Sequence, residues 1–147
     1  MQFIDLKAQQ EIIRSKIDKR LQSILDHGKY IMGPEVFELE EKLADYVSRK
    51  HCISCSSGTD ALIIPLMAYE IGPGDAVITS PFTYIATGEV IRMLGATPVF
   101  CDIYSSTFNI DPDNLQSAYD YAVSKKLNPK AIIPVDLFGL PARYRLI

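Results

Sequence analysis

Apolar positions in the first third of the chain repeat at helical spacing. The run over 11–26 has an apolar residue every three or four positions and stops just before Gly28, a residue type that commonly ends helices. A second run begins at Pro34, a typical first residue of a helix. Its apolar positions are Val36, Leu39, Leu43, Tyr46 and Val47. We therefore predict two helices joined by a loop over 29–33, the second with one buried face.

From residue 51 onward, short apolar runs alternate with helical segments. The predicted strands are 52–55, 76–79, 97–101 and 131–135, and the predicted helices between them are 59–71, 82–94 and 113–124. Strands that alternate with helices of about 10–15 residues pair in parallel through right-handed crossovers. The predicted fold class is therefore α/β, with a mostly parallel sheet that helices cover on both faces.

Composition and charge narrow the class of protein. The chain has 147 residues, 48% of them hydrophobic and 22% charged, which is typical of one globular domain. A net charge of −3 argues against nucleic-acid binding as the main function, since that binding requires clustered positive charge. The first residues lack the basic and apolar regions of a signal peptide, and the apolar run over 61–69 is too short to span a membrane. We expect a cytoplasmic protein with reduced thiols.

The three cysteines raise the question of a redox or metal site. Cys52 and Cys55 have the spacing of a redox pair or of half a zinc site. In a strand, however, residues three apart face opposite sides of the sheet. No second pair of Cys or His residues has ligand spacing. We favour structural cysteines and expect no metal site.

Ligands of such sheets bind at the carboxyl ends of the strands, where loops lead into helices. In the loop over 56–61, Gly58 permits close backbone approach, and Thr59 and Asp60 offer amides in the first helical turn. Unpaired amides, the Thr59 hydroxyl and the helix dipole together suit a phosphate group. The alternative is an ordinary helix cap, in which Ser57 or Thr59 binds its own first-turn amides.

Two further loops lie at the same predicted edge. In the loop over 80–87, an aromatic side chain can present a flat face to a ring-shaped ligand. The alternative is that Phe82 or Tyr84 fills the core. In the loop over 135–139, the carboxylate of Asp136 follows a strand. Three such loops at one edge indicate a binding site more strongly than any one of them does.

Motifs in these loops and between them resemble those of the DegT/StrS-type sugar-nucleotide aminotransferases, pyridoxal-phosphate enzymes of fold type I. The resemblance runs from Phe3 to Gly139, and its motifs occupy 3–6, 30–36, 57–62, 72–79, 81–87, 94–100 and 132–139. Within the family, the sequence is similar to the group that aminates UDP-linked 3-keto-hexuronates for surface polysaccharide. The resemblance implies transfer of an amino group from an amino acid, usually glutamate, to a keto-sugar nucleotide by a homodimer.

The resemblance also implies roles for particular residues. Gly58, Thr59 and Asp60 would hold the cofactor phosphate, and Tyr84 would stack on the pyridine ring. The loop that contains Tyr30, Met32 and Gly33 would lie near the sugar-nucleotide site. Asp136 stands where many relatives carry His, and we assign it no chemical step.

Two catalytic groups of the family are not found among the motifs of this sequence. The Schiff-base Lys and the acid that protonates the ring nitrogen lie downstream of Gly139 in relatives, and this chain ends at Ile147. Arg143 stands where relatives usually carry Asp. We expect a helical segment over 1–50 and the first half of the cofactor-binding domain over 51–147, with sheet edges and apolar surface left exposed and no transamination by the chain alone.

Two other function classes remain as alternatives. The first is a non-catalytic phosphate- or nucleotide-binding module, or a regulatory relative that keeps the pocket without the reactive Lys. The second is DNA binding, which the acidic balance and the lack of a basic recognition helix disfavour.

Overall fold

The computed structural model describes residues 4–147. The chain divides into two compact units, Met1–Ser54 and Cys55–Ile147, and each has its own internal packing. Among the residues described, no helix combines the length and the apolar character that a membrane span requires.

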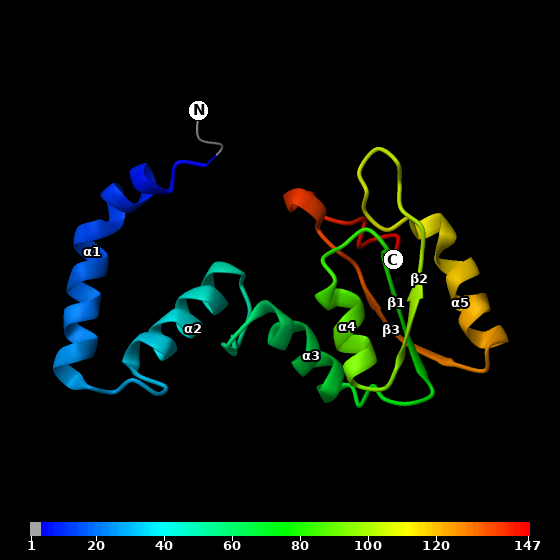
Figure 1. The fold of residues 1–147 in the computed structure, drawn as a ribbon, viewed down its shortest axis with the longest axis horizontal. Coiled ribbons are helices and arrows are strands. Elements are labelled where there is room, and N and C mark those ends of the chain that lie inside the picture. The colour runs from blue at the N-terminus through cyan, green and yellow to red at the C-terminus, as the bar shows by residue number, and fades with distance from the viewer. Residues whose placement is uncertain (1–3) are drawn as a thin grey trace. The chain divides into compact units, whose positions relative to one another are not determined.

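Residues 4–54 of the first unit form two helices, α1 (Leu6–His27) and α2 (Pro34–Tyr46), as Figure 1 shows. The Asp5 carboxylate caps α1 by accepting the amide of Ala8 at 3.0 Å, so the helix begins earlier than predicted. Gly28 ends it in the left-handed conformation (φ 64°), with its N–H donating to Ile24. Pro34 is the first residue of α2, as predicted. Both predicted helices are therefore confirmed.

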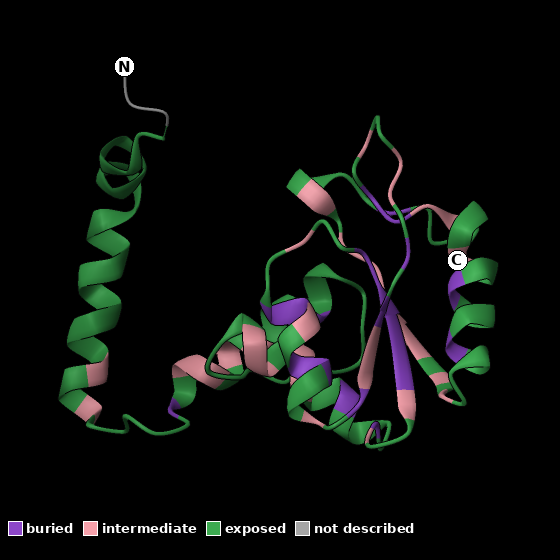
Figure 2. Cartoon of the chain, turned by 45° about the vertical axis from the view of Figure 1, so that its right-hand side comes forward, coloured by how far each residue is buried: buried purple, intermediate pink, exposed green. Residues whose placement is uncertain are grey.

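The predicted buried face of α2 is wrong. Ala44 is the one buried residue described in α2, and α1 has none (Figure 2). The side chains of Leu39, Leu43, Tyr46 and Val47 are exposed. Two helices are too little structure to enclose an apolar face on their own. An ion pair between Arg20 and Glu38, with nitrogen–oxygen distances of 2.6 and 2.5 Å, links the two helices instead.

The second unit is built on a three-stranded parallel sheet in the order β2-β1-β3. The strands are β1 (Asp75–Thr79), β2 (Thr97–Phe100) and β3 (Asn128–Ile133). Helices α3 (Gly58–Ala68) and α4 (Ala86–Met93) lie on one face of the sheet, and α5 (Leu115–Ser124) lies on the other (Figure 1). This confirms the predicted α/β fold, which the alternation of strands and helices in the sequence indicated.

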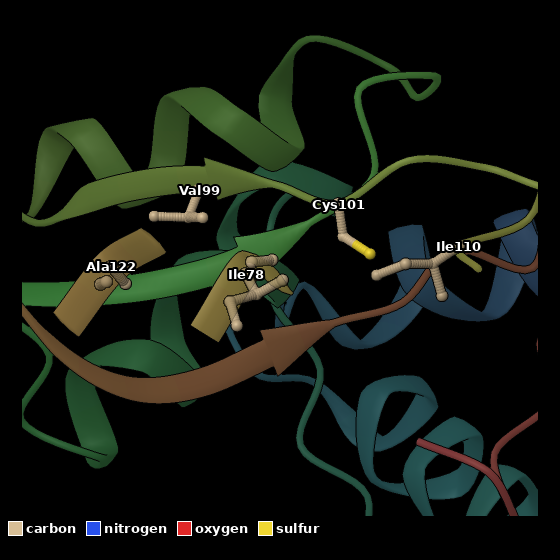
Figure 3. Packing of buried hydrophobic residues seen from close by; sticks show 7 residues of the cluster. Ile78, Val99, Cys101, Ile110 and Ala122 are labelled. Atoms are coloured by element: carbon tan, nitrogen blue, oxygen red, sulfur yellow. The ribbon is translucent and has the colours of Figure 1, made fainter. Parts of the chain in front are cut away.

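Alternating side chains of β1 divide the core into two clusters. Ala76 and Ile78 pack toward α5, and Val77 packs toward α3 and α4. The cluster on the α5 side appears in Figure 3; its buried members are Ala76, Ile78, Val99, Cys101, Ile110, Ala118 and Ala122. The opposite cluster consists of Leu66, Ile71, Val77, Val90, Ile91 and Ala96. The central strand is thus covered on both faces, as its apolar sequence predicted.

Several predicted boundaries differ from the structure. No strand forms over 52–55, because no other described strand pairs with that segment. Helix α4 begins at Ala86 rather than at residue 82, since Ser80 turns the chain by accepting the amide of Phe82 through its side chain at 3.1 Å. Strand β3 begins at Asn128, and Pro129 pairs opposite Ala76 next to a bulge. An edge strand tolerates this proline, which the prediction excluded from the strand.

Candidate functional site

Three loops follow the carboxyl ends of the strands at one edge of the second unit (Figure 1). They are the segments 80–85 after β1, 101–111 after β2 and 134–140 after β3. The last residues of α3 lead through a short turn into the amino end of β1. The first residues of α3 lie at the opposite end of the helix from this turn. The candidate cofactor residues therefore come from the start of α3 and from the loop after β1.

Ser57 organises the start of α3. Its side chain accepts the amide of Asp60 at 3.1 Å, and its carbonyl accepts the amide of Ala61 at 3.0 Å. The cap predicted as the alternative to a phosphate site is therefore present. Among the described residues, the amides of Gly58 and Thr59 donate to no protein atom. Two of the three candidate groups thus keep a free backbone donor, and the Asp60 amide does not.

The surroundings of the two free amides suit an anion. A Cβ added to Gly58 would meet no atom within 4 Å, so the space beside this backbone is open. Thr59 is half-buried and adds a hydroxyl, and the positive end of the α3 dipole lies at the same place. The Asp60 carboxylate is bonded to the hydroxyl of Ser56. The donors available to a phosphate group here are neutral, because the loop over 56–61 contains no Lys or Arg.

Tyr84 is the more accessible of the two candidate aromatic residues. Its side chain is 79% exposed, and its carbonyl accepts the amide of Thr87 at 3.1 Å, which fixes the backbone at the start of α4. Phe82 instead packs on Phe108, with 5.2 Å between the ring centroids. The alternative in which Tyr84 fills the core is therefore excluded, and its ring is open to contact.

Asp136 serves as an anchor within the protein. Its Oδ1 atom accepts the amide of Ala142 at 2.9 Å and the hydroxyl of Tyr144 at 2.8 Å. This hydrogen bond, together with burial and the nearby charge, raises the pKa of Tyr144. These contacts tie Asp136 to the last residues of the chain.

Asn109 is a residue that the sequence analysis did not single out. It is buried, and its side chain joins two loops: Nδ2 donates to the carbonyl of Leu140 at 2.9 Å, and Oδ1 accepts the amide of Leu137 at 3.1 Å. These bonds hold the segment in which Phe138 and Gly139 take positive φ angles of 53° and 83°. A single sequence signals such a role only weakly, because Asn at a turn is ordinarily exposed.

The lysines of the second unit lie at the other edge of the sheet. Lys125 and Lys126 directly follow the end of α5, which runs back toward the amino ends of the strands. Lys130 reaches the carbonyl of Glu70 at 2.8 Å and the carboxylate of Asp75 at 3.4 Å. None of these three ammonium groups stands in the loops at the carboxyl edge.

The candidate sugar-nucleotide residues belong to the first unit, in the loop between α1 and α2. Tyr30 and Met32 are 68% and 55% exposed, and Gly33 is buried. A hollow beside them is lined by Lys29, Met32, Pro34, Phe37, Glu38 and Glu41. Its two carboxylates outnumber its single ammonium group, so this hollow itself is unfavourable for a diphosphate.

Comparison with known proteins establishes the family. Residues 11–146 match the profile of the DegT/DnrJ/EryC1/StrS aminotransferases. The chain belongs to that family. The resemblance seen in the sequence motifs is thus confirmed. Over all 147 residues, this DegT-family chain is 52% identical to a UDP-2-acetamido-2-deoxy-3-oxo-D-glucuronate aminotransferase from Pseudomonas aeruginosa, of which it covers 39%.

Solved structures of DegT-family proteins share the fold. An aminotransferase of the family from Brucella abortus superposes with a TM-score of 0.96 at 46% identity, covering 99% of this chain and 39% of the other. NtdA from Bacillus subtilis, solved with the bound cofactor PMP, gives a TM-score of 0.80 at 33% identity, covering 90% of this chain and 29% of the other. The family's enzymes depend on pyridoxal phosphate, and the chain spans well under half the length of these relatives.

Proposed function

We propose that this chain contributes the phosphate and ring contacts of a pyridoxal-phosphate aminotransferase that acts on a UDP-linked 3-keto-hexuronate for surface polysaccharide. The amino donor we expect is glutamate. The observation that carries the proposal is the pair of free amides at Gly58 and Thr59, beside open space at the start of α3. The 52% identity to the Pseudomonas enzyme supports the substrate class.

Each residue of this site has a distinct role in the proposal. The amides of Gly58 and Thr59 and the Thr59 hydroxyl bind the cofactor phosphate, while Ser57 keeps the first turn in place. The ring of Tyr84 covers one face of the cofactor ring. The cofactor, when bound, supplies an electron sink for cleavage of bonds at the donor carbon. The fit of donors to a phosphate group supports this assignment.

The remaining chemistry requires groups that these residues do not provide. A lysine amine must reach the cofactor, and the lysines of the second unit lie at the opposite edge of the sheet. We therefore propose that the residues described here bind the cofactor without transaminating. In the complete enzyme, which we propose is a cytoplasmic homodimer, the loop with Tyr30, Met32 and Gly33 contacts the nucleotide sugar.

Titration of the chain with pyridoxal phosphate tests the phosphate site, with pyridoxal as the ligand that lacks the phosphate. We expect the phosphate ester to bind at least about tenfold more tightly, since hydrogen bonds to charged groups contribute roughly 1.5–3 kcal/mol. Gly58→Asp places a carboxylate in the open space at a helix start where it is compatible with folding, and it should abolish that preference. Equal binding of both ligands, or an unchanged preference in Gly58→Asp, contradicts the proposal.

A second comparison tests the ring contact and the predicted inactivity. Tyr84→Ala should weaken cofactor binding, whereas Tyr69→Ala, which alters a tyrosine of similar exposure just past the end of α3, should leave it unchanged. Borohydride reduction of the cofactor-treated chain, followed by mass spectrometry, should fix no pyridoxyl group at a specific lysine. A single stoichiometrically labelled lysine contradicts the predicted inactivity.

A further inference from the structure

The loop between α1 and α2 is closed tightly on itself. A Cβ added to Gly33 would lie 2.4 Å from the carbonyl oxygen of Lys29, so the two ends of the loop are in direct backbone contact. Met32 has a positive φ of 48°, an uncommon conformation for a residue with a side chain. Tyr30, Ile31 and Met32 are nevertheless exposed. Because these exposed side chains do not hold the loop closed, contacts at its first and last residues must do so.

His27, the last residue of α1, makes contacts at this base with both the loop and α2. Its Nδ1 atom lies 3.0 Å from the amide nitrogen of Lys29, and its Nε2 atom lies 3.2 Å from Oε1 of Glu35. Both side chains are about three-quarters buried, with 24% and 25% of their surface exposed. The amide is always a donor and the ionised carboxylate always an acceptor. Only a neutral imidazole with its proton on Nε2 satisfies both partners.

Protonation of the ring changes the two contacts in opposite directions. A proton on Nδ1 turns that atom into a donor that faces the Lys29 amide, which is also a donor, so this hydrogen bond is lost. The contact between Nε2 and Glu35 becomes charge-assisted and stronger. The ring therefore stays attached to α2 while its bond to the loop breaks.

The charged groups near the His27 ring include its hydrogen-bond partner, Glu35. Glu35 faces it from α2, and Lys19 and Asp26 on α1 line the same surface hollow. The pKa of Glu35 is lowered, chiefly by its own backbone amide, then by the hydrogen bond from His27 and by the charge of Arg20. Glu35 thus stays ionised from mildly acidic to neutral pH.

We propose that His27 is a positioning residue that holds the 29–33 loop closed while its ring is neutral and releases Lys29 when the ring is protonated. The consequence for ligand binding rests on the proposed function, because Tyr30, Met32 and Gly33 are its candidate sugar-nucleotide residues. Nucleotide-sugar affinity then falls in mild acid through this one side chain.

Nuclear magnetic resonance of the 147-residue chain between about pH 5 and pH 8 tests the positioning role. The His51→Gln variant leaves His27 as the single histidine, since the chain has two. At the alkaline end, the ring should carry its proton on Nε2 and the Lys29 amide should be protected from exchange. Loss of that protection should follow ring protonation with the same midpoint. A proton on Nδ1 at the alkaline end, or a Lys29 amide that exchanges freely there, overturns the proposal.

Two variants of His27 separate positioning from general packing. In His27→Asn, the side-chain oxygen takes the place of Nδ1 as acceptor, so Lys29 protection should persist and lose its pH dependence. In His27→Ala, protection should be absent at every pH. If His27→Ala fails to fold, the tautomer of the unmodified ring and the flat profile of His27→Asn still decide the matter. A pH-dependent profile in His27→Asn overturns the proposal.

Titration with UDP-N-acetylglucosamine separates this role from the proposed function. Its affinity should be several-fold lower at about pH 5.5 than at about pH 8 in the unaltered chain, and equal within about twofold in His27→Asn. If the loop titrates as expected while no nucleotide sugar binds at either pH, the positioning role is supported and the proposed function fails at this loop. If the sugar binds with no loop titration, the proposed function stands and the positioning role is overturned.

Discussion

At the scale of single residues, the buried side-chain amide of Asn109 joins two loops of the candidate site through two hydrogen bonds. Asn109→Ala leaves the amide of Leu137 and the carbonyl of Leu140 without partners. Leu137 is half-buried and Leu140 exposed, so water can reach both groups once the amide is removed. A hydrogen bond contributes about 0.5–1.5 kcal/mol net, so we expect loss of the two bonds to lower the free energy of unfolding by about 1–3 kcal/mol. Urea denaturation measures it. Asn114→Ala, which removes an exposed bond to Asp111, should change stability by less than about 0.5 kcal/mol. Equal losses in the two variants contradict this assignment.

The cysteines differ in reactivity for a physical reason that the fold supplies. Burial, with the charges of Asp111 and Asp102, raises the pKa of Cys101 to about 11, whereas Cys55 is exposed. Thiols react as thiolates, so at neutral pH iodoacetamide should label Cys55 at least about a hundredfold faster than Cys101. Peptide mapping over time measures both rates. In urea the two rates should converge. Similar rates in the folded chain contradict the placement of Cys101 in the core.

At the scale of elements, the sequence predicted the helix ends and strands that depend on residues close together in the chain. The stop at Gly28, the start at Pro34 and the alternation of strands and helices follow from backbone preferences and from periodicity, and each is present. The segment over 52–55 forms no strand because a strand requires a partner, and no local pattern supplies one. Pro129 lies within β3 because edge position, a property of the whole sheet, makes it tolerable.

The candidate site shows the same division. The free amides of Gly58 and Thr59 follow from their place at a helix start, which the sequence predicted together with its cap. The engagement of the Asp60 amide by Ser57 is one of two local outcomes that the sequence left open. The role of Asn109 depends on a contact with residues some 30 positions away, which periodicity does not encode. Local chemistry was therefore predictable, and its long-range support was not.

Helices α1 and α2 provide a prediction of pH dependence. Hydrogen bonds and charge from Arg20 and Lys42 hold the pKa of Glu38 at about 2, below its ordinary 4.5. Because the folded-state pKa is the lower one, this contribution to stability is complete above about pH 4.5 and is lost as the pH falls toward 2. The loss of helical circular dichroism signal over this window should be smaller in Glu38→Gln than in the unaltered chain.

Salt and a neighbouring residue supply the controls for this effect. The Arg20–Glu38 pair is largely exposed, so salt at about 1 M should reduce its contribution. Glu41→Gln alters another carboxylate of α2 that forms no ion pair among the described residues, and it should reproduce the profile of the unaltered chain. A Glu38→Gln profile that coincides with the unaltered one contradicts the assignment.

At the scale of the whole molecule, large apolar side chains are exposed along α1. Helix α1 buries none of its residues, and Ile12 and Leu25 are 80% and 63% exposed. Both β2 and β3 are edge strands with one unpaired side. Burial of apolar surface contributes about 25 cal/mol per Å², which favours association of the chain with itself at high concentration.

Light scattering across a concentration series tests this expectation. The mean mass should rise with concentration, and the double variant Ile12→Lys/Leu25→Lys should shift the rise to higher concentration, because a charge on each position opposes burial of α1. Gln9→Lys/Gln22→Lys adds the same two charges to exposed polar positions of the same helix and controls for net charge. If the apolar residues of α1 drive association, the mass of the control variant should rise at nearly the same concentration as that of the unaltered chain. The prediction is wrong if the unaltered chain keeps the mass of a monomer at all concentrations. It is also wrong if both double variants shift the rise in mass equally.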